Sequence, residues 1–497
     1  MCRFRHKHQL RYYYVKTFTI MPVQSAYLCR RANLPGSFKI YDLLEALVKN
    51  FTFAMRCSAA LLVSCGAAAA ADLPSRKAAP VEYVRVCTGY GAGFFYIPGS
   101  DTCLRIGGRV RAEGRYLQTF NRGQDTTGFR ARGTLNFDTR TATAYGTLRT
   151  FLRYEITRNG GNYAGLATGQ TVYTPIVTQG FTQTVDLNKA FIQFGPITAG
   201  RATSFFDFYA NALNWGGAMG SDTYGFDPVV FAYTANFGSG FSATLSAEEP
   251  TSRRLNGTGV FPAGASTIAY GGSRMPDIVA NVNLTQGWGA AQLSAAVHEI
   301  NKPLSASNQG TEYGYAIQAG LKINLPMLAA GDVLWLQAAY ADGAMSYLGI
   351  NNSSSARQLG GLGFLQTDAA VDATGRVKTT TGYSLTAAYN HYWTPTIRQA
   401  VFANYTKLDY SPSVESPLVN GARGTLAGYT ADTSIIQAGS NLTWSPVAGL
   451  DLGVEVLYRR IDPRGRVVDF NRSVAGLTFV KGSQDVFEGR VRMQRDF

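Results

Sequence analysis

The stretch from Leu104 to Thr157 alternates between two kinds of side chain with a period of two residues. One set of positions is apolar and mostly small, as at Ile106, Gly108 and Val110, whereas the other set is dominated by arginine. A strict period of two predicts β-strands with chemically opposite faces. A soluble sandwich also alternates, but its polar face is mixed. An apolar face opposite a charged face is typical of a membrane barrel whose strands surround a water-filled lumen.

Alternating or apolar segments continue to the end of the chain, and sixteen can be counted from Leu104 onward. After the first three they cover 184–194, 197–202, 229–237, 240–248, 277–285, 289–299, 312–324, 332–341, 380–392, 397–409, 432–444, 450–461 and 484–497. Short spacers, such as DTRT (138–141) and WTPT (393–396), alternate with long ones. The chain has no run of about 18 apolar residues that could form a spanning helix.

An even number of strands, joined alternately by tight turns and long loops, is the topology of an outer-membrane barrel. We therefore predict an all-β fold over residues 104–497. It would be a 16-stranded antiparallel transmembrane β-barrel with short periplasmic turns and long external loops. A soluble fold has no reason to keep this alternation of spacers along the whole chain.

The N-terminal region has the features of an export signal. Residues 57–71 are an apolar, small-residue run that follows Lys49 and Arg56 and ends in an Ala-x-Ala-like site at Ala71. We expect residues 48–71 to be a signal peptide, with a buried alanine-rich helix as the alternative. Residues 1–47 do not fit an export signal, which indicates an over-extended start outside the mature protein. Without residues 1–71 the chain keeps 36 of its 46 basic and 30 of its 32 acidic residues, so its composition gives no support to nucleic-acid binding.

Two cysteines remain beyond this segment, Cys87 and Cys103, on either side of a short glycine-rich stretch. In an exported protein such a pair predicts a disulfide. Free or metal-bound thiols are the alternative, although no histidine lies nearby in the sequence to complete a zinc site. We expect residues 72–103 to form an extended periplasmic lead-in that contains this disulfide hairpin.

The last predicted strand ends at the terminal residue, Phe497, which shares a face with Phe487 and Val491. A closing strand that ends in phenylalanine is the usual substrate of the barrel-assembly machinery. We therefore expect that machinery to be a partner of the chain.

Four strings are more specific than the alternation: ADLPSRKAAPVEYVRVC, GAGFFYIPGSDTCLRIGGRVRAE, GRATSFFDFYAN and YTANFGSGFSATLS. Together they resemble the alphaproteobacterial porin family of rhizobial and related bacteria, over residues 71–497. The resemblance implies a homotrimer in the bacterial outer membrane, with a third loop folded into each pore. It also implies passive diffusion of small hydrophilic solutes and ions, and contacts with membrane lipid and lipopolysaccharide.

The third long spacer, residues 203–228, is too hydrophobic for a solvated external loop. It holds Phe205, Phe206, Phe208, Tyr209, Leu213, Trp215 and Met219. It also contains three acids, Asp207, Asp222 and Asp227, and no base. We expect it to fold inward, bury its aromatic side chains on the barrel wall and present the three carboxylates to the lumen. A loop that contacts a neighbouring subunit is the alternative.

Arginines of the first three strands are expected to face the lumen, because a charge on the lipid face costs about 2–4 kcal/mol at the bilayer midplane. They are Arg105, Arg109, Arg111, Arg115, Arg130, Arg132, Arg149 and Arg153, and Arg201 stands just before the loop. Opposite an acidic loop, these nine residues would line a constriction and set its ion preference. Structural pairing with Glu113, Asp138 and Glu155 is the alternative for part of this set.

Residues that could support catalysis are scarce. Beyond residue 71 the only histidines are His298 and His391, and neither has a recognisable Ser/His/Asp setting. We predict no enzymatic activity, no catalytic residue, no cofactor and no metal site. Two other classes remain open, namely a non-conducting structural barrel or adhesin and a barrel enzyme that uses one of these histidines.

Overall fold

The computed structural model describes residues 85–497 except 121, 123, 164–180, 218–219, 226, 256–258, 261–265, 268–269, 303–310, 351–361, 364–365, 416–427, 430 and 470–479. The expected start region and signal peptide lie outside the described residues. Within the described part, no helix is both long enough and apolar enough to span a bilayer.

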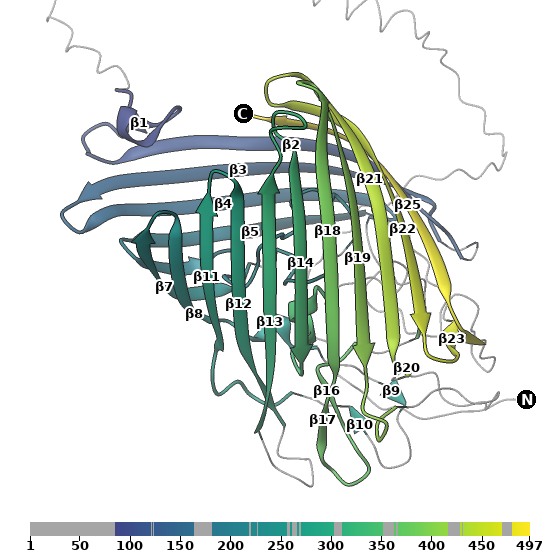
Figure 1. Ribbon diagram of the computed structural model, residues 1–497. Coiled ribbons are helices and arrows are strands. Elements are labelled where there is room, and N and C mark those ends of the chain that lie inside the picture. The colour runs from purple at the N-terminus through teal and green to yellow at the C-terminus, as the bar shows by residue number, and fades with distance from the viewer. Residues whose placement is uncertain are drawn as a thin grey trace, which may run out of the picture. The chain divides into compact units, whose positions relative to one another are not determined.

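Sixteen strands form one closed antiparallel sheet (Figure 1). They are β2 (Cys103–Leu117), β3 (Thr127–Thr143), β4 (Gly146–Gly161), β5 (Phe181–Phe194), β6 (Ile197–Arg201), β7 (Val229–Gly238), β8 (Phe241–Glu248), β11 (Asp277–Gln286), β12 (Gly289–Asn301), β13 (Thr311–Asn324), β14 (Val333–Asp342), β18 (Thr381–Thr394), β19 (Ile397–Asp409), β21 (Thr433–Val447), β22 (Leu450–Pro463) and β25 (Gln484–Asp496). Each strand pairs with the next, and β25 pairs with β2 from Glu488–Leu117 to Asp496–Arg109, which closes the barrel.

The shorter elements lie before the barrel or in its long loops. Those before the barrel are η1 (Thr88–Tyr90) and β1 (Phe95–Tyr96). Those in the loops are η2 (Thr251–Arg253), β9 (Gly259–Val260), β10 (Ser266–Thr267), η3 (Met345–Leu348), β15 (Leu362–Gly363), β16 (Ala369–Val371), β17 (Val377–Thr379), β20 (Gly428–Tyr429), β23 (Val467–Asp469) and β24 (Val480–Lys481). They pair as β9–β20, β10–β16–β17 and β15–β23–β24, so loops from distant parts of the chain pair with each other.

The predicted barrel topology is confirmed, and most strand limits agree within three residues, as for 397–409 and β19. One predicted turn was wrong. DTRT does not end a strand, because β3 continues through it to Thr143 and the turn comes at Ala144–Tyr145. Asp138 therefore lies within the strand, on its inner face. Its carboxylate binds Arg149 of β4, 2.9 Å away on the same face of the sheet.

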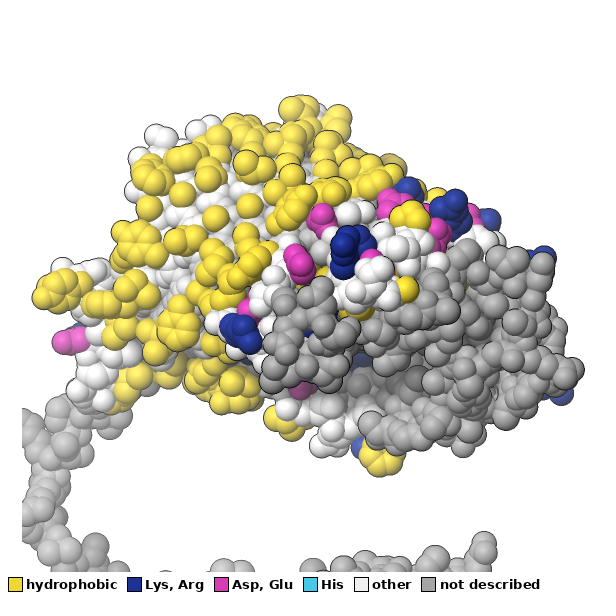
Figure 2. All heavy atoms as spheres, turned by 90° about the horizontal axis from the view of Figure 1, so that it is seen from below, with side chains coloured by type: hydrophobic (Ala, Val, Ile, Leu, Met, Phe, Trp, Pro, Cys, Tyr) yellow, Lys and Arg dark blue, Asp and Glu magenta, His cyan; other side chains and the backbone are white. Residues whose placement is uncertain are grey.

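The two faces of the barrel wall have opposite chemistry, as the alternation predicts. Apolar side chains such as Val110 and Phe129, the latter 71% exposed, cover the outer face. Figure 2 shows this apolar surface, with the visible charged side chains gathered beside the loops. Polar side chains such as Ser294 and Ser384 are buried on the inner side. An apolar outside suits hydrocarbon, and a polar inside suits water and the inserted loop.

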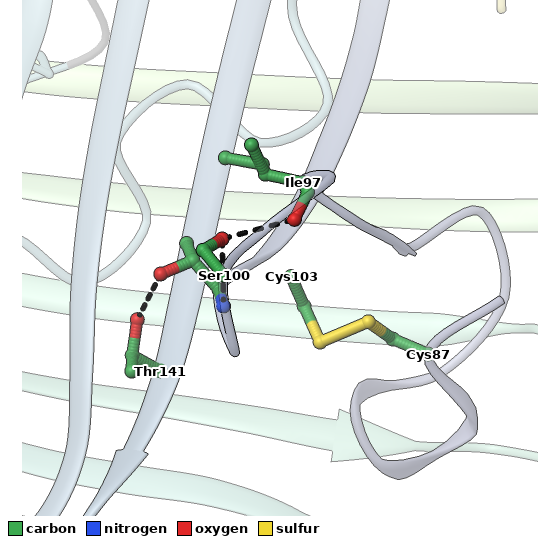
Figure 3. Close-up of a disulfide and its surroundings, with 6 residues drawn as sticks. Cys87, Ile97, Ser100, Cys103 and Thr141 are labelled. Carbon is green, nitrogen blue, oxygen red and sulfur yellow. Dashed lines mark hydrogen bonds between the residues drawn. A yellow bond between two sulfur atoms is a disulfide. The ribbon is translucent and has the colours of Figure 1, made fainter. Parts of the chain in front are cut away.

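The predicted disulfide between Cys87 and Cys103 is present (Figure 3), with their Cα atoms 6.1 Å apart. Cys103 is the first residue of β2, and Tyr96 of β1 lies directly opposite it. The turn between these two strands is closed by Ser100, whose hydroxyl donates a 3.0 Å hydrogen bond to the carbonyl of Ile97. Phe94 is buried against both cysteines, so the lead-in forms a small core of its own beside the barrel.

Candidate functional site

The loop 203–228 leaves the wall after β6 and crosses the lumen to strands far along the chain. The backbone N–H of Tyr209 donates to the side-chain oxygen of Gln337 on β14, at 2.8 Å. The carbonyl of Leu213 accepts a 2.7 Å hydrogen bond from the side chain of Asn441 on β21. The backbone N–H of Trp215 donates to Glu455 Oε2 on β22, at 2.7 Å. The predicted inward fold of this third loop is therefore confirmed.

Aromatic side chains hold the loop against the wall. Phe206 is fully buried, with its ring centroid 4.7 Å from that of Tyr347 in η3. Phe208 and Tyr209 both meet Trp335 of β14 edge to face, with centroids 5.2 and 5.7 Å apart. Their burial is the physical reason why a loop of this composition leaves the aqueous exterior.

The three loop acids have partners within the loop or beside it. Asp207 accepts hydrogen bonds from the N–H and hydroxyl of Thr223 at 2.8 and 2.6 Å. Asp222 is 0% exposed and accepts from the backbone N–H groups of Ala210 and Tyr224. Its assignment as a residue that lines the pore was wrong. A tightly folded loop leaves backbone donors without sheet partners, and these carboxylates satisfy them.

Asp227, at the end of the loop, is paired with a lysine on β5, the strand next to β4. Its carboxylate lies 3.3 Å from the ammonium of Lys189 on β5. The same lysine is hydrogen-bonded to Thr203, at the start of the loop. Lys189 thus ties both ends of the loop to one strand.

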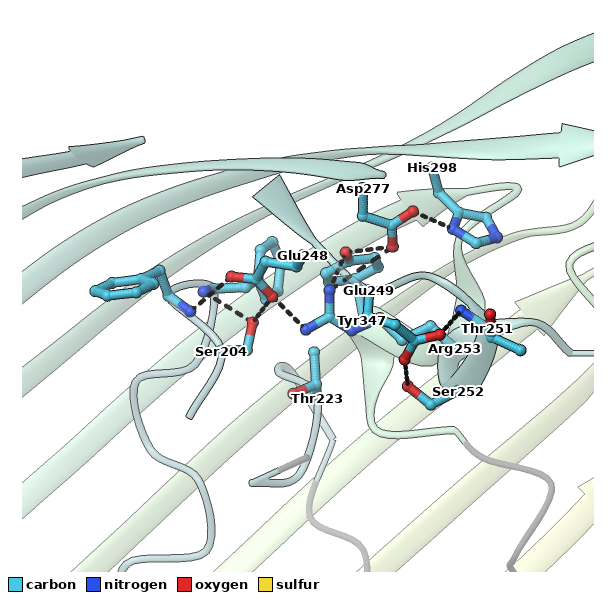
Figure 4. Close-up of polar contacts among 12 residues, drawn as sticks. Ser204, Thr223, Glu248, Glu249, Thr251, Ser252, Arg253, Asp277, His298 and Tyr347 are labelled. Atoms are coloured by element: carbon cyan, nitrogen blue, oxygen red, sulfur yellow. Dashed lines mark hydrogen bonds and ion pairs between the residues drawn. The ribbon is translucent and has the colours of Figure 1, made fainter. Parts of the chain in front are cut away.

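A buried polar cluster fixes the base of the loop (Figure 4). Glu248 of β8 accepts hydrogen bonds from the N–H of Phe205 at 3.0 Å and from the hydroxyl of Ser204 at 2.8 Å. Arg253 of η2 forms a 2.6 Å ion pair with Glu248, and its Nη1 donates to the hydroxyl of Tyr347 at 2.6 Å. The inward loop and two external loops are therefore joined through one charge pair.

The cluster extends to His298, one of the two histidines on which the barrel-enzyme alternative depends. His298 is 1% exposed and its Nδ1 lies 2.8 Å from Asp277, which also accepts from the hydroxyl of Tyr347. At the short-turn end, His391 lies 2.7 Å from Asp332. Among the described residues, neither ring is hydrogen-bonded to a serine, threonine or cysteine side chain.

Eight of the arginines proposed for the pore lie on the inner face of β2, β3 and β4, where Arg140 joins them. We call these nine residues the arginine wall: Arg105, Arg109, Arg111, Arg115, Arg130, Arg132, Arg140, Arg149 and Arg153. Residues directly opposite in antiparallel strands point to the same face. Arg111 lies opposite Arg132, and Glu113 lies opposite Arg130, so these side chains share the inner surface. Arg140 was missed because its sequence neighbours look like a turn.

Part of the arginine wall forms ion pairs or hydrogen bonds within the barrel wall, as the alternative of structural pairing predicted. Arg130 lies 3.6 Å from Glu113, Arg132 lies 3.1 Å from Glu155 and Arg149 lies 2.9 Å from Asp138. Arg109 pairs with Asp496 of β25 at 2.5 Å, and Arg115 binds the side chain of Asn162.

Arg140 also pairs with Asp138, at 3.0 Å, whereas the other three residues of the wall have no such partner in the described part of the chain. Arg105, Arg111 and Arg153 form no ion pair with any described carboxylate. Arg111 and Arg153 instead donate to the amide oxygens of Gln494 and Asn136, both at 2.8 Å. The wall therefore keeps an excess of positive charge toward the lumen.

Arg201 does not belong to the lumen, and its assignment to the pore was wrong. It lies at the end of β6, directly opposite Ala190 and Val229. Val229 is 47% exposed on the outer face, as is Ile197 on the same side of β6. Residues in register on neighbouring strands share a face, so Arg201 points outward at the loop end of the barrel.

The family model of the Porin subfamily matches residues 72–487, which is most of the chain. The chain belongs to this family. Porin Omp2b of Brucella abortus (strain 2308) is similar to this porin, with 29% identity over 294 residues, 58% of this chain and 72% of the relative. Porin Omp2a of Brucella suis biovar 1 (strain 1330) has the same identity and covers 58% of this chain and 73% of its own length.

A solved structure shares the fold. The outer membrane channel DcaP of Acinetobacter baumannii superposes with a TM-score of 0.54 at 17% identity, over 81% of this porin and 99% of that chain. The family match, the similar porins and the closed barrel together identify the protein as a porin channel of the bacterial outer membrane. The family resemblance stated from the sequence is confirmed.

Proposed function

We propose that this porin is a passive channel for small hydrophilic solutes that favours anions, and that the arginine wall sets this preference. The supporting observation is the charge balance of the inner faces of β2, β3 and β4, where nine arginines meet three acids, Glu113, Asp138 and Glu155. The loop carboxylates, which would have balanced the wall, are engaged within the loop or by Lys189. A lumen lined by one sign of charge raises the local concentration of the opposite ion.

This proposal replaces the transverse field expected from the sequence. Because Asp222 is buried, and Asp207 and Asp227 already have partners, the described acids of the loop cancel less of the potential that the wall sends into the lumen. Screening sets its range, because the Debye length is about 10 Å at 0.1 M salt and about 3 Å at 1 M. The anion preference should therefore be strong at low salt and weak at high salt.

Planar-bilayer recording under a potassium chloride gradient tests the proposal. We expect stable conductance, with a reversal potential displaced toward the chloride equilibrium potential. A reversal potential midway between the chloride and potassium values would contradict an anion preference. A purified, folded barrel that never conducts would instead favour the structural barrel or adhesin.

Processing, partners and assembly belong to the same proposal. Residues 1–71 are removed on export, the outer face contacts membrane lipid and lipopolysaccharide, and β25, which ends just before Phe497, is presented to the barrel-assembly machinery. The working form is a homotrimer, and the chain has no enzymatic activity. N-terminal sequencing of membrane-extracted protein tests the first point, since a start before residue 60 would contradict removal up to Ala71.

A further inference from the structure

We propose that a cavity beneath the tip of the inward loop binds a small carboxylate. This inference rests on the anion preference proposed for the same channel. The cavity has a volume of about 470 Å³, within the range of small-molecule sites. On the barrel side it is lined by Arg109, Arg111, Arg398 and Arg492, and on the loop side by Asn211, Ala212, Asn214 and Trp215.

The lining carries more positive than negative charge. Its four arginines face two acids, Asp451 and Asp496, and both acids already have donors. Asp496 accepts from Nε and Nη2 of Arg109 at 2.5 and 3.2 Å. Asp451 accepts from Arg398 at 2.7 Å and from the hydroxyl of Ser445 at 2.6 Å. Neither carboxylate is therefore directed at the other two arginines.

Arg111 is the anchor of the proposed site. Its Nε donates to Gln494 Oε1 at 2.8 Å, and its two terminal nitrogens have no acceptor among the described residues. Arg132 lies directly opposite on β3, where like charges destabilise a sheet, and Glu155 forms an ion pair with Arg132 but not with Arg111. The planar fork of a guanidinium matches the two oxygens of a carboxylate.

The loop side of the cavity is fixed in place. The guanidinium of Arg492 lies 4.3 Å from the ring centroid of Trp215, and its Nε and Nη2 bind Glu113 behind the cavity. Asn214 donates to Asn211 Oδ1 at 3.1 Å and to the carbonyl of Gly216 at 2.9 Å, so both amides are held in the loop tip that lines the cavity. A carboxylate on Arg111 would therefore have amide groups and one indole beside it. This lining suits a small polar acid.

Single-channel recording with malonate as the probe tests the site. We expect malonate to interrupt the current in a saturable manner. Arg111→Gln should raise the half-blocking concentration about tenfold, as expected for the loss of charge-assisted hydrogen bonds. Arg153→Gln is the matched control, because Arg153 also lacks an ion pair on this wall but does not line the cavity. It should shift the half-blocking concentration by less than about twofold.

Arg111→Lys provides a second variant in case the glutamine variant does not fold. It keeps the charge but lacks the fork, so blocking should still weaken severalfold. Equal effects of Arg111→Gln and Arg153→Gln would overturn the site in favour of general electrostatics. Arg111-dependent blocking by inorganic phosphate but not by malonate would overturn the carboxylate assignment. An anion-preferring wild-type channel that malonate never blocks would overturn the site and leave the proposed function standing.

Discussion

Arg490 of β25 donates a 2.7 Å hydrogen bond from Nη1 to the backbone carbonyl of Trp215, 275 residues earlier in the chain. The same guanidinium forms a 2.6 Å ion pair with Glu488, and both side chains are buried. The tip of the inward loop is thus held by the strand that closes the barrel. We therefore expect this contact to control the size of the opening beside the arginine wall.

Replacing Arg490 with methionine should release the loop tip. The change removes the bond to Trp215 and leaves Glu488 buried without its partner, a loss of about 3–5 kcal/mol for a buried pair. We expect larger and noisier single-channel conductance. Arg495→Met is the control, because Arg495 lies on the same strand but binds the turn carbonyl of Ala448. Equal conductance without added noise in both variants would show that the Arg490–Trp215 contact does not hold the loop in place.

Asp222→Asn should disturb the loop without changing ion preference. An asparagine has one acceptor oxygen, so one backbone donor among those of Ala210 and Tyr224 would lose its partner, at a cost of about 1–3 kcal/mol. Hydrogen exchange of the loop amides should therefore become faster. The reversal potential should stay the same, because the carboxylate has no exposed surface. A clear shift toward anions would mean that Asp222 does contribute to the lumen potential.

Reducing the disulfide should loosen the lead-in and leave the barrel intact. Cys87 and Cys103 are 16 residues apart, and closing a loop of that length stabilises by about 3 kcal/mol in the chain-entropy account. We expect a Cys87→Ser/Cys103→Ser variant to exchange the amides of η1 and β1 faster, with unchanged exchange in β13 and β14. Equal protection of the lead-in in both proteins would argue that Phe94 and its neighbours hold it without the bond.

Arg201→Gln should leave the reversal potential unchanged. Arg201 shares the outer face with Val229, so its charge is separated from the lumen by the barrel wall. The same charge removed from Arg111 should reduce anion preference. If both changes act equally, the assigned direction of Arg201 is wrong.

Much of the fold could be predicted because each strand carries its own signal. The alternation around Ile106 and Phe129 specifies which face meets lipid, and it needs no knowledge of other strands. The outward direction of Arg201 could also be predicted, because Arg201 follows Ile197 and Ala199 at intervals of two residues and these face outward. Arg201 was assigned to the pore because it stands just before the loop, and the alternation along β6 was not applied to it.

The site could be predicted only in part, because its contacts join distant segments. The hydrophobic residues of 203–228 indicated burial, but nothing local identifies Gln337, Asn441 or Glu455 as the groups that receive the loop. Asp222 looked like a lining residue, since the sequence does not show which backbone donors a folded loop must satisfy. The Glu248–Arg253 pair is only five residues apart, but its contacts with Ser204 and Tyr347 form only once distant loops have met.

The central claim is that the arginine wall sets anion preference, and reversal potentials at low ionic strength test it most directly. The comparison is between the wild type and a variant with Arg109, Arg111 and Arg130 all changed to glutamine, with Arg201→Gln as the control. The wild type and the control should reverse near the chloride equilibrium potential, and the triple variant should move toward the potassium value. A triple variant that reverses where the wild type does would contradict the account.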